Sequence, residues 1–227
     1  MKLAIIVPVY NEAATIAEVV ARLRSVPLDK EIVVVDDGSA DGTWEALQPL
    51  AGPDLKLLRH PRNRGKGAAI RTALAAVTAE AVVIQDADLE YQPEELPALL
   101  APVASGRADV VYGSRFRGTI DGMRLSNYLA NKILAWTASI LFRARITDEA
   151  TCYKLFRTSL LKSLPLVSER FEFCPEVTAR VRRRGIRIHE VPITYRGRTV
   201  AMGKKIRLAD AWEAFYTLVK FRLSRVA

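Results

Sequence analysis

Residues 31–39, EIVVVDDGS, decide the fold class of this chain. A β-branched run with no polar residue between positions 32 and 35 is typical of a strand buried on both faces, as in a parallel sheet. Two acidic residues, Asp36 and Asp37, follow the run directly and lead into a glycine turn. In open α/β sheets, ligands bind beside the carboxyl ends of the strands. The stretch therefore predicts an α/β protein with a ligand crevice near these two residues.

Strand and helix patterns alternate on both sides of this stretch. Short apolar runs predict further strands at residues 2–8, 55–58, 81–84 and 109–113. Helical periodicity lies between the strands, at residues 13–23, 41–50, 65–77 and 93–103. Strands and helices that alternate through short connections predict a doubly wound, mostly parallel sheet flanked by helices.

The second half of the chain has a different pattern. Its predicted elements are a long helix at 125–142, a strand at 151–156, a helix at 178–184, a strand at 186–193 and a last helix at 208–223. The first and last of these helices are rich in apolar and aromatic residues, as core helices or amphipathic helices at a membrane interface would be. We expect one domain over residues 1–210, followed by a C-terminal amphipathic helix at 211–227.

Charge is distributed unevenly along the 227 residues, whose formal net charge is +9. Residues 1–113 carry 11 Lys or Arg against 16 Asp or Glu, and residues 114–227 carry 23 against 9. The basic half could face nucleic acid, an anionic membrane surface or a phosphorylated substrate, or be an ordinary solvated surface. The longest apolar stretch, residues 134–142, is too short for a membrane-spanning helix. Two cysteines predict no disulfide framework and fit a reduced, cytoplasmic setting.

Three polar clusters follow predicted strands, at residues 8–12 (PVYNE), 36–39 (DDGS) and 86–90 (DADLE). Because the carboxyl ends of parallel strands meet at one edge of a sheet, we expect the clusters to converge. Asp86 and Asp88 are one residue apart, so both carboxylates can reach one hard divalent cation that also binds substrate phosphates. Glu90 could add an oxygen ligand. A solvated acidic turn is the alternative.

Several basic residues lie near the same predicted edge. Lys66, in NRGKG at 63–67, opens a helix without the spacing of a phosphate-binding P-loop, and could meet a base, a phosphate or only solvent. Arg115 ends the fifth strand, and Arg198 and Lys204 lie in a glycine-bearing loop that could close over a diphosphate. Asp148 could be structural or catalytic. No nucleophile elbow, zinc spacing or dinucleotide-binding glycine motif is present.

The motifs VPVYNE, VVVDDGSADGT, NRGKGAA, DADLEY and GSRF, in this order and spacing, resemble those of family 2 glycosyltransferases with the GT-A fold. Within that family the chain is similar to the polyprenol-phosphate sugar transferases, over about residues 3–210. The later stretches TDEATCYKLFR, EVPITYRGR and GKKI are similar to that subgroup as well. The resemblance implies a GT-A, Rossmann-like sheet with C-terminal amphipathic helices.

The resemblance also implies roles for individual residues. Asp86, Asp88 and Arg115 would act at the reaction centre, and Asp88 and Glu90 would hold Mg²⁺ or Mn²⁺, although subgroup members often have Gln where Glu90 stands. Arg115, Arg124 and Asn127 would meet the phosphate of the acceptor. The donor-binding residues implied are Pro8, Tyr10, Glu12, Val35, Asp37, Asp86, Ala87, Asp88, Arg198 and Lys204. We add Lys66 to this set because it opens a helix where it could meet a base or a phosphate.

The activity implied is an inverting transfer of a sugar, mannose from GDP-mannose, to a polyprenyl monophosphate. An acceptor phosphate is already ionised at neutral pH, so no strong general base is needed. We expect a peripheral protein at the inner face of a membrane, with no nucleic-acid partner. The alternatives are a family 2 transferase using UDP-glucose or another donor with a non-lipid acceptor, a nucleotidyltransferase, and a non-catalytic module that binds nucleotide sugars or nucleic acid.

Overall fold

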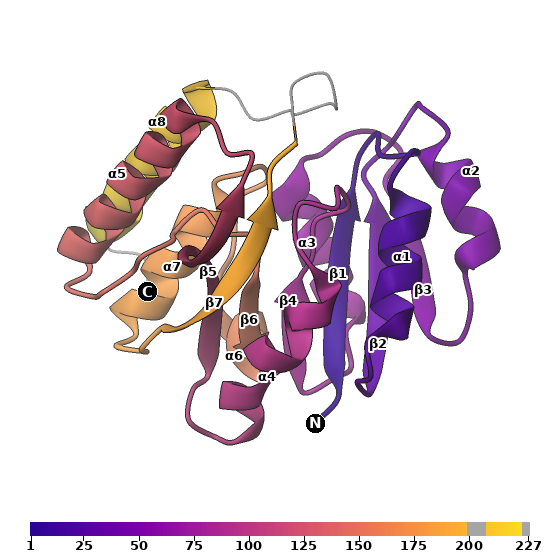
Figure 1. The fold of residues 1–227 in the computed structure, drawn as a ribbon, viewed down its shortest axis with the longest axis horizontal. Helices are drawn as coiled ribbons and strands as arrows, with labels where there is room; N and C mark the ends of the chain where they lie inside the picture. The colour runs from indigo at the N-terminus through magenta and orange to yellow at the C-terminus, as the bar shows by residue number, and fades with distance from the viewer. Residues whose placement is uncertain (199–207, 224–227) are drawn as a thin grey trace.

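The computed structural model describes residues 1–198 and 208–223 (Figure 1). Within these residues the strands form one sheet in the order β3-β2-β1-β4-β6-β5-β7, with helices packed on it. The elements are β1 Leu3–Val9, α1 Ile16–Ser25, β2 Lys30–Asp36, α2 Thr43–Leu47, η1 Gln48–Leu50, β3 Leu55–Arg59, α3 Lys66–Ala76, β4 Ala81–Ile84, η2 Pro93–Glu95, α4 Leu96–Ala104, β5 Val110–Asp121, α5 Leu125–Leu141, β6 Lys154–Arg157, α6 Thr158–Ser163, α7 Phe173–Arg183, β7 His189–Arg196 and α8 Leu208–Leu223.

The first four strands form the parallel part of the sheet. Strand β1 pairs in parallel with β2 on one side and β4 on the other, and β2 pairs in parallel with β3. Ile5, Val34 and Val83 are wholly buried, as expected for strands covered by helices on both faces. The segments that follow β1, β2 and β4 therefore lie at one edge of the sheet, which confirms the prediction that the three polar clusters converge there.

Strand β6 is the antiparallel member of the sheet. It lies between β4 and β5 and runs opposite to both, whereas β7 runs parallel to β5. The sheet is thus mostly parallel, as predicted. The reversal puts the loop that precedes β6, residues 147–153, at the same edge as the ends of β1, β2 and β4.

Two elements extend five or more residues beyond their predicted bounds. Strand β5 continues to Asp121 because it pairs with β7 beyond an irregularity between Ser114 and Thr119. Gly118 allows this pairing, since a Cβ there would lie 2.1 Å from the carbonyl oxygen of Ile193. Helix α7 begins at Phe173, five residues before the predicted start. Its first turn contains Pro175, where a missing N–H leaves no helical hydrogen bond unmade.

Helices α5 and α8 lie side by side beyond the β5–β7 end of the sheet (Figure 1). They pack on each other and on α7 through Leu134, Ala138, Phe142, Ala179, Leu218 and Phe221. None of the helices in the described part of the chain is long and apolar enough to cross a membrane. The opposite sides of α5 and α8 carry exposed large apolar residues, which we call the outer apolar face: Leu125, Leu129, Ile133, Trp136, Ile140, Trp212, Tyr216 and Leu223.

Candidate active site

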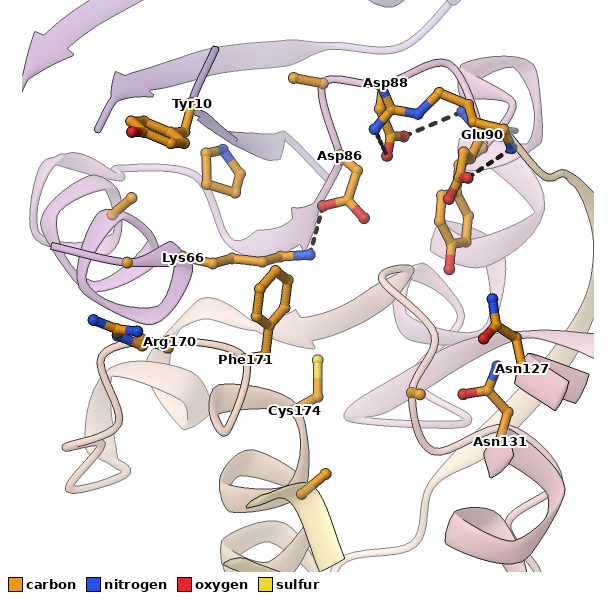
Figure 2. Close-up of a pocket in the computed structure, with 18 of the residues that line it drawn as sticks. Tyr10, Lys66, Asp86, Asp88, Glu90, Asn127, Asn131, Arg170, Phe171 and Cys174 are labelled. Atoms are coloured by element: carbon orange, nitrogen blue, oxygen red, sulfur yellow. Dashed lines mark hydrogen bonds and ion pairs between the residues drawn. The ribbon is translucent and has the colours of Figure 1, made fainter. Parts of the chain in front are cut away.

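A cavity of about 640 Å³ opens at the carboxyl ends of β1, β2 and β4. Its opposite wall comes from α5 and from the segment that leads into α7 (Figure 2), and the end of β7 borders the acidic loop after β4. The three polar clusters predicted to converge all contribute to it. The sequence-predicted residues that line it are Pro8, Tyr10, Glu12, Asp37, Lys66, Asp86, Ala87, Asp88, Glu90, Arg115, Asn127 and Arg198.

Three other sequence-predicted residues are not brought to this cavity by the described structure. Val35 is wholly buried within β2 and is absent from the cavity wall. Arg124 is the exposed N-cap residue of α5 and is likewise absent from the wall, although Asn127, one turn further on, lines it. Lys204 lies outside the described residues.

The turns after β1 and β2 are tied to each other by short side chains. The N–H of Asn11 donates to Oγ of Ser39 at 2.9 Å, and the N–H of Ala40 donates back to Oδ1 of Asn11 at 3.0 Å. Asn11 has φ = 51°, a left-handed conformation that Asn tolerates better than most residues. This locking fixes the backbone on either side of the partly exposed ring of Tyr10 at the cavity mouth.

Asp37 organises the loop that leads into α3. Its carboxylate accepts the N–H groups of Arg64 at 2.9 Å and Gly65 at 2.7 Å, and lies 2.6 Å from Nδ1 of the buried His60. Gly65 has φ = 100°, and a Cβ there would lie 2.4 Å from the carbonyl oxygen of Glu169. Only glycine fits this turn, which places Lys66 over the cavity.

The acidic end of the cavity is formed by the loop after β4. Nζ of Lys66 lies 2.5 Å from Oδ1 of Asp86, and Nη2 of Arg198 lies 2.9 Å from Oδ2 of Asp88 (Figure 2). Burial and the negative charges of Asp86 and Glu90 raise the pKa of Asp88 to about 7, against the opposing effect of Arg198. Burial, the largest single effect, would lower the pKa of Lys66, but the charge and hydrogen bond of Asp86 together with the nearby Cys152 and Cys174 raise that pKa above its usual value. Three acidic residues thus lie close together in one partly buried loop.

Arg198 joins three parts of the site. Its guanidinium donates to Glu12, at 2.9 Å from Nη1, as well as to Asp88. Its backbone N–H donates to Oε1 of Glu90 at 2.8 Å, while Oε2 of Glu90 accepts the hydroxyl of Tyr195 at 2.8 Å. The end of β7 is therefore fastened to the acidic loop, and Arg198 stands between the carboxylates that follow β1 and β4.

The residues present fit a divalent cation at the acidic end. The negative charges of Asp86 and Glu90 raise the pKa of Asp88, which shows that the carboxylates repel one another. A hard divalent cation bound between them would remove this repulsion. Over residues 1–198 and 208–223, no group of three or more His, Cys, Asp or Glu side chains is arranged to hold a metal by itself. An ion held by one or two carboxylates would complete its ligands with phosphate oxygens and water, as Mg²⁺ commonly does.

Arg115 lies on the side of the cavity formed by β5. It is 5% exposed, and its guanidinium binds the carboxylate of Asp148 through two hydrogen bonds of 2.7 Å, from Nε and Nη2. The backbone N–H of Arg115 donates to the same carboxylate at 2.9 Å. Asp148 is wholly buried and does not line the cavity, so its role is to hold Arg115.

A further carboxylate supports this pair. Glu190 on β7 accepts the backbone N–H groups of Thr147 and Asp148 and the hydroxyl of Thr147. The turn that carries Asp148 is therefore fixed from β7. Burial would lower the pKa of Arg115, but the charge of Asp148 raises it, so the guanidinium stays positive within the cavity wall.

The cavity also includes residues that the sequence did not single out. Asn131 lies one helical turn after Asn127 and points the same way (Figure 2), so the i, i+4 spacing could have identified it. Arg170 and Phe171 come from the segment that enters α7, and Cys174 from the first turn of that helix, where no motif marks them.

Known proteins resemble the chain over most of its length. Residues 4–164 match the model of glycosyl transferase family 2. An undecaprenyl-phosphate mannosyltransferase of Micrococcus luteus is 32% identical over 218 residues, which cover 90% of this chain and 87% of that protein. A dolichol-phosphate mannosyltransferase of Pyrococcus furiosus is 28% identical over 220 residues, covering 91% of this chain but 61% of that longer protein.

Among solved structures, the glucosyl-3-phosphoglycerate synthase of Mycobacterium tuberculosis in complex with Mn²⁺, uridine diphosphate and phosphoglyceric acid has a similar fold. The TM-score is 0.76 at 22% identity, covering 100% of this chain and 80% of that one. The likeness confirms the GT-A arrangement of a mostly parallel sheet flanked by helices.

Proposed function

Because the chain belongs to glycosyl transferase family 2, we propose that it transfers a sugar from a nucleoside diphosphate donor to a polyprenyl monophosphate. Mannose from GDP-mannose is the transfer we favour, since the relatives described above carry mannosyltransferase names. The observation that carries the proposal is one cavity with two ends. An acidic end at residues 86–90 suits a cation and a diphosphate, and the buried cation Arg115 suits a second phosphate.

The donor would lie along the ends of β1, β2 and β4. Its base and ribose would occupy the space lined by Pro8, Tyr10, Asp37 and Lys66, and its diphosphate would reach Asp88 and Arg198. Arg198 pairs with Glu12 and Asp88 in the free protein, so donor binding would exchange carboxylate partners for phosphate partners. Lys204 lies beyond the described residues, and its role in this exchange stays a prediction.

Arg115 would bind the phosphate of the acceptor and aim one of its oxygens at the anomeric carbon of the sugar. That oxygen is ionised at neutral pH, so the displacement needs no general base, and a single displacement inverts the anomeric centre. Asp148 keeps the guanidinium oriented before the acceptor arrives, and such preorganised charge lowers the barrier without reorganisation. Asn127 and Asn131 offer amide groups on the same side of the cavity.

Mg²⁺ or Mn²⁺ would be held by Asp88, with Glu90 as its second protein ligand. The chemistry such an ion supplies is neutralisation of the charge that develops on the departing diphosphate. Asp86 is paired with Lys66, which places a further positive charge at this end of the cavity.

We also propose that the outer apolar face of α5 and α8 rests on the membrane that contains the acceptor lipid. Its large apolar side chains are exposed, and Trp136 and Trp212 are of the type enriched at membrane interfaces. Arg124, Lys132, Arg143, Lys220 and Arg222 lie on or beside the same helices, and an anionic membrane surface attracts such charges. The acceptor's phosphate would then enter the cavity past Asn127 on α5.

A transfer assay tests the proposed activity. The protein is given radiolabelled GDP-mannose, UDP-glucose or UDP-N-acetylglucosamine with Mg²⁺ or Mn²⁺, with and without a polyprenyl phosphate. We expect label from GDP-mannose to enter the organic phase only when both metal and lipid phosphate are present. If label enters the organic phase from a uridine nucleotide sugar instead, that sugar nucleotide and not GDP-mannose is the donor. Hydrolysis of a donor without labelling of the lipid would reject a polyprenyl phosphate as the acceptor.

Membrane contact is tested with the Ile133→Ser/Trp136→Ser variant, which removes two exposed apolar side chains from α5. Fully burying one such side chain contributes about 1.5–3 kcal/mol, so we expect binding to anionic vesicles to fall at least about tenfold. Vesicle co-sedimentation measures the change. Val167→Ser is the matched control, because Val167 is exposed but lies outside both helices. Unchanged vesicle binding by the double variant would reject the orientation proposed here.

A further inference from the structure

The segment that enters α7 is held firmly against the start of α3. The carboxylate of Glu176 accepts the N–H groups of Val167 and Ser168, at 3.0 and 2.8 Å from its nearer oxygens. The carbonyl oxygen of Glu169 accepts the N–H of Ala68 at 2.9 Å. The backbone N–H of Arg170 is held by the carboxylate of Glu172 at 3.0 Å. The backbone at residue 170 is therefore fixed relative to the loop that carries Gly65 and Lys66.

Arg170 belongs to this segment and lines the cavity at its edge, below the backbone of Lys66 (Figure 2). Its side-chain stem packs on Gly65 so closely that a Cβ on Gly65 would lie 2.8 Å from Cγ of Arg170. Among the described residues its guanidinium forms no hydrogen bond or ion pair, unlike Arg115 and Arg198, which are both held by carboxylates. A cation in the wall of a cavity, with a fixed backbone and no protein partner, is available to a ligand.

The position of Arg170 indicates which part of a donor it could meet. It lies beside the backbone of Lys66, on the opposite side of the cavity from Asp88 and Glu90 (Figure 2). Phe171 follows it and lies below the Lys66 side chain, and Tyr10, in the turn after β1, lies above that side chain. If the diphosphate occupies the acidic end, the region with Arg170 holds the base. Aromatic side chains can stack on a base of any kind, so they do not choose between bases.

We propose that Arg170 selects guanine as the base of the donor, an inference that rests on the proposed function. An arginine fork donates two parallel N–H groups, and guanine presents two adjacent acceptors, O6 and N7, on one edge. Uracil has no such pair, and adenine presents a donor beside its N7. The inference gives a structural reason for the GDP sugar favoured above. It rests on a residue outside the motifs of the first half of the chain.

The test is nucleotide binding measured by calorimetry with Mg²⁺, using GDP, UDP and 7-deaza-GDP, which lacks the N7 acceptor. We expect wild-type protein to bind GDP about tenfold more tightly than either analogue, the lower part of the range for bidentate base contacts because Arg170 is exposed. We expect Arg170→Ala to remove this preference by weakening the binding of GDP while leaving the binding of UDP and 7-deaza-GDP unchanged. Arg170→Lys, which keeps the charge without the fork, removes it as well. Arg107→Ala, at an exposed arginine elsewhere, leaves all three affinities unchanged.

The results separate this inference from the proposed function. Equal weakening of GDP and UDP in Arg170→Ala would mean a phosphate contact and would overturn the inference, as would a wild-type preference for UDP. Either result leaves a nucleotide-sugar transferase intact. Wild-type protein that binds no nucleoside diphosphate at all would overturn both. Because Arg170 is exposed and its backbone is held by neighbouring side chains, neither variant should disturb folding, which circular dichroism checks.

Discussion

Asp88→Asn is expected to lower kcat for sugar transfer about a thousandfold while the protein stays folded. A loss of three orders of magnitude corresponds to about 4 kcal/mol of transition-state stabilisation, which is typical of removing a group that controls charge on the leaving side. Asparagine keeps the shape of the side chain but lacks the charge that attracts a divalent cation. Folding should not suffer, because Asp88 is crowded by Asp86 and Glu90, and a neutral residue relieves that repulsion.

Two measurements on the same preparation check this expectation. Label transferred to the lipid measures activity, and the midpoint of thermal unfolding should equal or exceed that of the wild type. A more stable but inactive variant is the usual sign of a carboxylate kept for function rather than for folding. Asp54→Asn serves as the control, since Asp54 forms an exposed ion pair with Arg24 away from the cavity. Turnover within tenfold of the wild type would reject Asp88 as a metal ligand.

The convergence of the acidic residues could be predicted because it depends on strand direction alone. Parallel strands that contain Ile5, Val34 and Val83 must end at one edge, so the residues that follow them must meet. The same reasoning placed Arg115 near that edge, at the end of a fifth strand. Family motifs then added expected roles for these residues. Those roles stay predictions, whereas the shared location is confirmed.

Other features depended on contacts that leave no pattern in the sequence. Arg170 reaches the cavity because Gly65 and Gly67 let residues 168–170 pack closely on the start of α3, and nothing in the sequence of that segment indicates the approach. Asp148 could not be assigned because a buried acid and a catalytic acid look alike until a partner is known. Its partner, Arg115, is 33 residues away in the sequence and meets it through the reversed strand β6. Such pairings are set by tertiary structure and not by periodicity.

The Arg115–Asp148 pair yields the second large effect. Asp148→Leu should destabilise the fold by about 3–5 kcal/mol, because it leaves the guanidinium of Arg115 buried without its counter-charge. Arg115→Met should cost a similar amount by stranding the carboxylate. The Arg115→Met/Asp148→Leu double variant buries neither charge and should recover much of the lost stability. The coupling between the two sites is therefore expected to reach about 2 kcal/mol or more.

Urea unfolding of the four proteins measures this coupling, and the transfer assay separates stability from activity. The double variant should be folded yet transfer no sugar, since it lacks the guanidinium proposed to bind the acceptor phosphate. Recovery of transfer in the double variant would show that Arg115 serves folding alone. If the destabilisation of the double variant equals the sum of those of the two single variants, the two side chains do not stabilise each other. That result would contradict the importance assigned to their two hydrogen bonds of 2.7 Å. A buried guanidinium in the wall of a ligand cavity, held in place by a buried carboxylate, is the arrangement expected of a group retained for binding phosphate.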